Sequence, residues 1–149
     1  MNLTTPRRIA ALLPVLAVSA AVAACGGSDD AEFVDGYNKA VAPLNSMMTD
    51  LGTTSPSDPS AASKSLNQVA DGLDEVRTNL AALEPPAEAS DEFDQMLGAL
   101  DKGTDQVREM AGAAKSGNLE KLTKATSDFS ATGTDLVKIE QQLRTLVEN

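Results

Sequence analysis

Few residues of this chain are suited to covalent chemistry, and the most reactive of them is Cys25. The sequence of 149 residues contains one Cys and no His. Without an imidazole, a Ser nucleophile lacks its usual general base, and a zinc or copper site lacks its usual nitrogen ligands. Carboxylates remain, but we find no Asp or Glu pair at positions that the apolar pattern assigns to a core. We therefore expect a protein that is not an enzyme, with no metal ion and no cofactor.

Cys25 is preceded by residues in the order of an export signal. The basic pair Arg7-Arg8 comes before an apolar run at residues 9–20, and small residues follow that run. The run is too short for a comfortable membrane span. These features predict a signal peptide over residues 1–24.

The four residues Val22, Ala23, Ala24 and Cys25 resemble the lipobox of bacterial lipoproteins, in which a branched apolar residue and two small residues precede a Cys. The resemblance implies that a signal peptidase cuts before Cys25, that its sulfur carries diacylglycerol, and that the new amino group receives a fatty acid such as palmitate. It implies an extracytoplasmic protein, lipid-anchored to the outer leaflet of the cell membrane. An apolar helix with an incidental Cys and an export signal cut elsewhere are the alternatives.

The residues after Cys25 divide into a short tether and one domain. Residues 25–31 contain Gly26 and Gly27 followed by small and acidic residues, which is typical of a flexible tether. Residues 32–149 carry a regular apolar pattern and form the predicted domain. Their length fits a single domain.

The charge of the chain limits its partners. Lys and Arg number 12 and Asp and Glu number 22, which gives a formal net charge of -10. Binding to nucleic acid or to anionic lipid headgroups needs clustered Lys and Arg. We therefore expect no nucleic acid partner, contact with the membrane only through Cys25, and a protein or peptide of the cell envelope as partner.

Apolar residues of the domain repeat with the three-and-four spacing of packed helices. Aromatic residues are 3% of the chain, and no β-branched run suggests a strand. The apolar stripes cover Val34–Leu51, Ala62–Leu83, Phe93–Ala114 and Leu119–Leu146. Four such stripes joined by short links predict an all-α fold, an antiparallel up-down-up-down four-helix bundle.

Helix-breaking residues separate these stripes. Ser55 and Pro56 predict a helix start, since Ser favours the N-cap and Pro the first helical position. Pro85 predicts a helix end at Glu84. The remaining signals are Ser90 as a further start, Gly117 and Asn118 as a C-terminal cap followed by an N-cap, and Pro43 as a kink or a later start of the first helix.

The link between the second and third helices adds a second resemblance. Its sequence, Leu-Glu-Pro-Pro-Ala-Glu over residues 83–88, is similar to a stretch found in small uncharacterised helical lipoproteins of high-GC Gram-positive bacteria. That resemblance implies a lipid-anchored location at the cell envelope and a helical architecture, but no activity.

Small residues cluster near the middle of the last two helices. If these helices fold back about Gly117, Gly103 lies opposite roughly Ala131, with Thr104, Thr132 and Gly133 nearby. These small residues would make a narrow level of the bundle, a waist. The waist either lets the helices approach closely or leaves a cavity for an acyl chain or another apolar ligand. On the outer side of the third helix, we expect Asp105 to pair with Arg108.

Two functions remain consistent with these patterns. The first is a non-catalytic interaction or scaffold module at the cell envelope, held there by the lipid on Cys25. The alternative is a carrier or sensor of a small apolar ligand, which would bind at the waist formed by Gly103, Thr104, Ala131 and Gly133.

Overall fold

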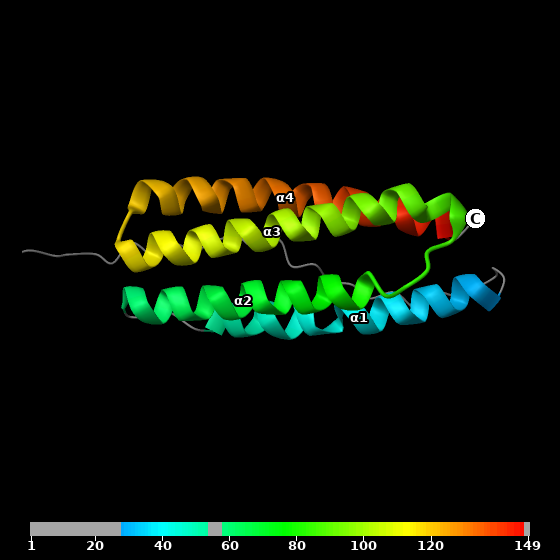
Figure 1. Ribbon diagram of the computed structural model, residues 1–149, viewed down its shortest axis with the longest axis horizontal. Coiled ribbons are helices and arrows are strands. Elements are labelled where there is room, and N and C mark those ends of the chain that lie inside the picture. The colour runs from blue at the N-terminus through cyan, green and yellow to red at the C-terminus, as the bar shows by residue number, and fades with distance from the viewer. Residues whose placement is uncertain (1–27, 54–57, 148–149) are drawn as a thin grey trace, which may run out of the picture.

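The computed structural model describes residues 28–53 and 58–147, and these residues form four long helices and one short 3-10 turn (Figure 1). The elements are α1 (Ser28–Thr53), α2 (Pro59–Leu80), η1 (Ala87–Ala89), α3 (Ser90–Ser116) and α4 (Leu119–Val147). No strand occurs in the described residues. The predicted all-helical fold is confirmed.

The helices lie side by side with α3 in the middle. Among the described residues, the backbone of α3 lies close to those of α2 and α4 (Figure 1). The backbone of α1 lies mainly against that of α2. The ring of Phe33 on α1 meets the ring of Phe93 on α3 edge to face, with centroids 5.4 Å apart. This contact closes the core between two helices that are not sequence neighbours.

Most buried core residues of the described chain come from α2 and α3, and α1, η1 and α4 add the others. Leu80 and Val76 of α2 and Val107 of α3 are the largest apolar side chains that are fully buried. Phe33, which the predicted stripe of the first helix left out in favour of Val34, is buried as well. Tyr37, Val41 and Leu44 of the predicted stripe do face the core. The prediction is wrong at its first position, where Phe33 and not Val34 is buried, because the ring of Phe33 reaches that of Phe93.

The turn from α3 to α4 is the one that the sequence predicts. Gly117 has a φ of 67° and a ψ of 18°, a left-handed conformation that Gly adopts without strain. The amide of Asn118 donates to the carbonyl of Ala113, and the amide of Gly117 donates to Ala114, the two bonds of a Schellman cap. The Asn118 side chain then accepts from the amide of Lys121 at 3.0 Å, which begins α4.

Both ends of α2 differ from the prediction. The helix is capped by Asp58, whose Oδ1 accepts from the amide of Ala61 at 2.8 Å, with Pro59 at the first helical position. The start predicted at Ser55 and Pro56 lies outside the described residues. The helix ends at Leu80, four residues before the predicted Glu84.

The early end of α2 has a packing reason. Leu83 lies beyond the helix and is placed against Gly36 of α1, where a Cβ on Gly36 would come within 2.7 Å of Leu83 Cδ2. Glycine at position 36 thus makes room for Leu83, which joins the core from the link and not from the helix. The three-and-four spacing of apolar residues placed Leu83 on the helix. That spacing is a property of residue order, so it cannot show that the chain leaves the helix before Leu83.

The first helix begins earlier than expected. Because α1 starts at Ser28, residues 28–31 of the expected tether are helical, and the domain start predicted at residue 32 falls within the first turns. Ser and Asp are residue types that favour helix starts, which accounts for helix formation there. The helix also continues through Pro43, so the alternative of a later start is wrong.

Candidate functional site

The predicted lipidation motif precedes the folded part of the chain. Val22, Ala23, Ala24 and Cys25 lie outside the described residues, as does the predicted signal peptide. Only Gly26 and Gly27 separate Cys25 from the first residue of α1. A lipid on Cys25 would therefore hold the helical domain by two residues, which span at most about 7 Å.

The small residues of the predicted waist do not all meet. Gly103 and Thr104 of α3 are buried, but Ala131 of α4 is exposed and Gly133 is partly exposed with open space around its Cα. Gly103 faces Phe129 and Thr132 instead: a Cβ built on Gly103 would lie 3.6 Å from Phe129 Cε2 and 3.9 Å from Thr132 Cγ2. The predicted pairing of Gly103 with Ala131 is off by one position, and one residue turns a helix face by about 100°.

Three polar side chains of α3 and α4 are buried. Thr104 is 1% exposed, Thr132 is 2% exposed and Gln106 is 9% exposed. Oγ1 of both threonines and Oε1 of Gln106 have no hydrogen-bond partner among the described residues. A buried polar group without a partner costs about 1–3 kcal/mol, so native structures keep few of them.

The other threonines of these helices show what is unusual about Thr104 and Thr132. A helical Thr can donate its hydroxyl hydrogen to the carbonyl four residues earlier. The hydroxyls of Thr78, Thr123, Thr126, Thr134 and Thr145 all do so. Thr104 and Thr132 do not use this local acceptor, so their hydroxyls are buried without a hydrogen-bond partner among the described residues.

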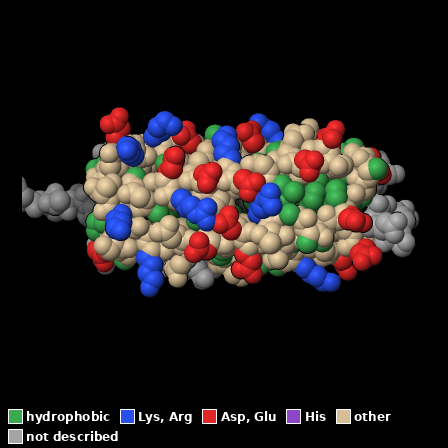
Figure 2. All heavy atoms as spheres, viewed as in Figure 1, with side chains coloured by type: hydrophobic (Ala, Val, Ile, Leu, Met, Phe, Trp, Pro, Cys, Tyr) green, Lys and Arg blue, Asp and Glu red, His purple; other side chains and the backbone are tan. Residues whose placement is uncertain are grey.

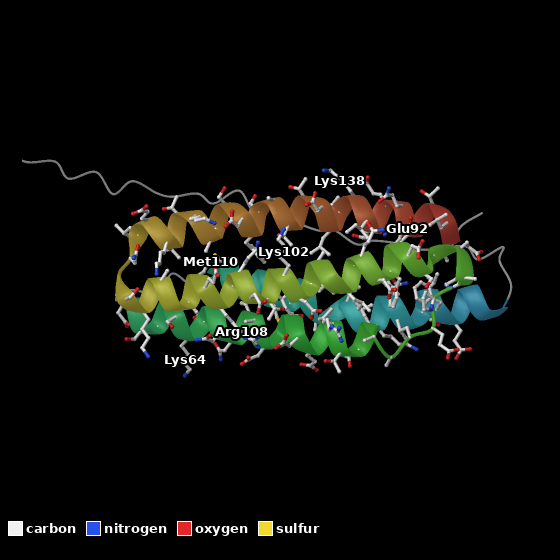
Figure 3. The ribbon with its side chains drawn as sticks, turned by 45° about the horizontal axis from the view of Figure 1, so that its top comes forward. Lys64, Glu92, Lys102, Arg108, Met110 and Lys138 are labelled. Carbon is white, nitrogen blue, oxygen red and sulfur yellow. The ribbon has the colours of Figure 1, made fainter. Side chains whose placement is uncertain are left out.

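A polar contact crosses the α3–α4 interface. Thr126 of α4 also lies 3.3 Å from the sulfur of Met110 on α3, and Figure 3 shows Met110 on the side of α3 that faces α4. Gln106 is one helical turn from both Gly103 and Met110, so it shares their side of α3. Sequence reasoning missed Gln106. Its position three residues after Gly103 and four before Met110 is the spacing of residues that share a helix face, and this spacing would have indicated that Gln106 lies on the same side of α3.

The edge of the α2–α3 interface is closed by ion pairs. Arg77 of α2 pairs with Asp101 of α3 at 3.0 Å. Arg108 of α3 pairs with Asp74 and, at 4.0 Å, with Asp71, and Figure 3 shows it toward α2. The predicted pairing of Arg108 with Asp105 is wrong, because Arg108 reaches across to the neighbouring helix.

The ion pairs of α4 stay within α4. Lys124 pairs with Asp128 at 2.5 Å, Lys138 with Asp135 at 3.4 Å and Arg144 with Glu140 at 3.0 Å. Among the described residues, no ion pair joins α4 to α3, whereas those of Arg77 and Arg108 join α2 to α3. The attachment of α4 to the bundle therefore rests on side-chain packing.

Tyr37 of α1 lies close to α4. Burial raises the pKa of its phenol, and the Glu140 carboxylate raises it further, while the Arg144 guanidinium acts in the opposite direction. The ring of Phe33 lies 6.3 Å from that of Tyr37. The neutral phenol is thus the form that this part of the bundle favours.

The apolar stripe of α4 is covered less completely than those of α2 and α3. Its members Leu122, Phe129, Leu136, Ile139 and Leu146 pack against the core but remain partly exposed. Leu119, at the start of the helix, is 75% exposed, the one large apolar side chain with such exposure in the described residues. Figure 2 shows charged side chains of both signs over much of the visible face, with apolar side chains between them.

No metal cluster or membrane span is found in the described part of the chain. Within residues 28–53 and 58–147, no group of three or more Cys, Asp or Glu side chains is close enough to hold a metal ion. None of the helices described there combines the length and the apolar character that crossing a bilayer requires.

Comparisons with known proteins give no family. The sequence matches no protein-family model, and the searches found neither a curated protein nor a solved structure that is significantly similar.

Proposed function

We propose that this chain is a lipoprotein, anchored outside the cytoplasmic membrane by lipid on Cys25, whose helices form an up-down-up-down bundle that acts as a non-catalytic interaction module. The order of a basic pair, an apolar run, small residues and the single Cys supports the anchor. The start of α1 at Ser28 supports a short tether between Cys25 and the helical domain. A module so attached works within a few nanometres of the membrane.

The observation that carries the interaction role is the partly covered stripe of α4. A helix of a self-sufficient bundle buries its apolar stripe, but most large apolar side chains of α4 keep contact with solvent. The three ion pairs of α4 join residues of α4 to one another, and within the described residues no ion pair joins α4 to another helix. An apolar strip between charged borders is a common form of protein interaction surface.

The anchor is tested with an alkyne-bearing palmitate fed to cells that produce the full chain. We expect label on the wild-type protein and its recovery in the membrane fraction. The variant Cys25→Ala should lose the label and leave that fraction. Label that persists in the variant would show that lipid is attached elsewhere.

The interaction role is tested with a photo-reactive residue placed at Ile139 on the partly exposed stripe. The control position is Asn79, which is exposed on α2 and outside the apolar core. We expect a discrete cross-linked product from position 139 and none from position 79. Because the partner is expected at the membrane, the product should fall strongly when Cys25→Ala is added. Equal, diffuse cross-linking from both positions would contradict the proposal.

A further inference from the structure

We propose that Met47 of α1 is an oxidation site, at which a peroxide converts the thioether to a sulfoxide and thereby releases the C-terminal part of α1 from α2. Hydrogen peroxide transfers one oxygen atom to the sulfur, the O–O bond breaks and water leaves. The sulfur loses two electrons and the peroxide gains them. The site involves only α1 and α2, so the inference does not depend on lipid at Cys25 or on a protein partner.

The sulfur of Met47 lies at a position where α2 has no side chain. A Cβ built on Gly72 would collide with Met47 Sδ and would lie 2.8 Å from its Cε. Glycine is unfavourable in the interior of a helix, so the space that it leaves for Met47 accounts for its presence there. The thioether thus packs directly against the backbone of α2 and against the apolar core.

Met47 is more accessible than the methionines of α3. Met96 is 3% exposed and Met110 is 7% exposed. The sulfur of Met110 also accepts from the hydroxyl of Thr126, at 3.3 Å. The side chain of Met47 is partly exposed, and no hydroxyl group occupies its sulfur in the described residues. Because oxidation follows access to the sulfur, a peroxide should react at Met47 before it reacts at Met96 or Met110.

The part of α1 that carries Met47 can separate from the part before it, because Pro43 lies between them. Proline has no amide hydrogen, so the helical hydrogen bond to the carbonyl of Lys39 is missing. Before Pro43, Phe33 and Val41 are buried in the core. After Pro43, none of the α1 side chains that the structure describes is buried. Contacts such as that of Met47 with Gly72 therefore hold this part of α1 in place.

Oxidation would break the contact between Met47 and Gly72. A sulfoxide is polar, and its oxygen needs hydrogen bonds that an apolar contact surface does not supply. There is no room for another atom between the sulfur and Gly72, since even a Cβ would collide there. The oxidised side chain therefore turns to solvent, and residues 44–53 separate from α2 while the part of α1 before Pro43 stays in the core.

The experiment treats the full chain, as its cells produce it, with hydrogen peroxide. Tandem mass spectrometry measures sulfoxide at each methionine, with fragment ions that separate Met47 from Met48, and amide hydrogen exchange measures the opening of residues 44–53. We expect Met47 to react on the order of tenfold faster than Met96 and Met110. Exchange of residues 44–53 should rise on the order of tenfold, with that of residues 59–80 and 90–116 unchanged. Methionine sulfoxide reductases should reverse both changes.

Two pairs of variants separate the sulfoxide from a general loss of stability. Met47→Leu removes the sulfur and keeps an apolar side chain of similar volume, so peroxide should no longer alter the exchange of residues 44–53. Its control, Met110→Leu, should keep the response. Gly72→Ala fills the space of the sulfur and should raise this exchange without peroxide. Its control, Gly98→Ala, should not, because a Cβ there meets no atom within 4 Å.

Oxidation of Met96 or Met110 as fast as that of Met47 would overturn the proposal. The same holds for a Met47 sulfoxide with unchanged hydrogen exchange, for loosening by peroxide that persists in Met47→Leu, and for complete exchange of residues 44–53 before any peroxide is added.

Discussion

The α2–α3 and α3–α4 interfaces share the middle helix but use different chemistry. Between α2 and α3, fully buried apolar side chains such as Leu80, Val76 and Val107 are bordered by Arg-Asp pairs that join the helices. Between α3 and α4, the interface contains Gly103 and Thr132, with a polar contact between Thr126 and Met110. Within the described residues, no ion pair joins α3 to α4.

We infer from this difference that the α2–α3 interface contributes mainly to stability and the α3–α4 interface mainly to binding. Deep apolar burial with paired charges at the rim stabilises one arrangement of α2 against α3. Unpartnered buried hydroxyls and a partly covered stripe do little to stabilise α4, and sites that break a packing rule in this way are often functional. We expect changes at the first interface to alter folding and changes at the second to alter binding.

The largest effect should come from comparing the same substitution in the two regions. Leu80→Ala removes a fully buried side chain of α2 and should lower the free energy of unfolding by about 2–5 kcal/mol. Leu136→Ala removes a partly exposed side chain of α4 and should cost about 1 kcal/mol. Urea unfolding of both variants measures the difference. Equal losses would remove the distinction between the interfaces.

A smaller effect is expected at the turn that joins α3 to α4. Gly117→Ala forces a side chain into a left-handed conformation and should destabilise the protein by about 1–2 kcal/mol. The matched control is Gly112→Ala, in an exposed part of α3 with open space around it, which should stabilise by up to about 1 kcal/mol. Thermal unfolding followed by circular dichroism checks both signs. A stabilising Gly117→Ala would show that the cap is not formed in solution.

The ion pairs should contribute less. Arg108→Ala removes the contacts of Arg108 with Asp74 and Asp71 across the α2–α3 rim, and should cost about 0.5–1 kcal/mol because the groups are largely exposed. Lys138→Ala removes a pair within α4 and should cost less. The difference should shrink in about 1 M salt, where exposed pairs are screened. A penalty that does not depend on salt would assign the role of Arg108 to packing.

The smallest effect near neutral pH is that of Tyr37, which appears only in alkali. Its pKa is raised in the folded protein, so the unfolded chain loses the proton first, near pH 10. Stability from the neutral phenol is therefore complete below about pH 10 and is lost as the pH rises further. The chain contains one Tyr and no Trp, so tyrosinate absorbance reports on Tyr37 alone. Ionisation at the ordinary pKa with the helices intact would place the ring in solvent.

Local residue chemistry made parts of the fold predictable. The Gly117-Asn118 break follows from backbone preferences and is found. The predicted start at Ser90 is found as well, with Asp91 and Glu92 in the first turn of α3. Periodicity could not show that Leu83 leaves the helix to pack on Gly36, because that contact joins residues far apart in sequence. For the same reason, it could not show that Arg108 reaches Asp74.

The candidate site was predictable only in outline. The small residues Gly103 and Thr104 marked the right level of α3, but the exact face of α4 depends on helix rotation, which brings Thr132 inward and turns Ala131 outward. The unpartnered state of the Thr132 hydroxyl depends on its rotamer. Neither property can be read from residue order.

We propose that cleavage before Cys25 and lipid on Cys25 hold this bundle at a membrane. Intact-mass and peptide mass spectrometry of the protein recovered from the membranes of its own cells tests this claim most directly. We predict that residues 1–24 are absent and that the chain begins at Cys25 with the added mass of diacylglycerol and, where the amine is acylated, of one more fatty acid. An unmodified Cys25, or a chain that still carries residues 1–24 as its stable form, would contradict the claim.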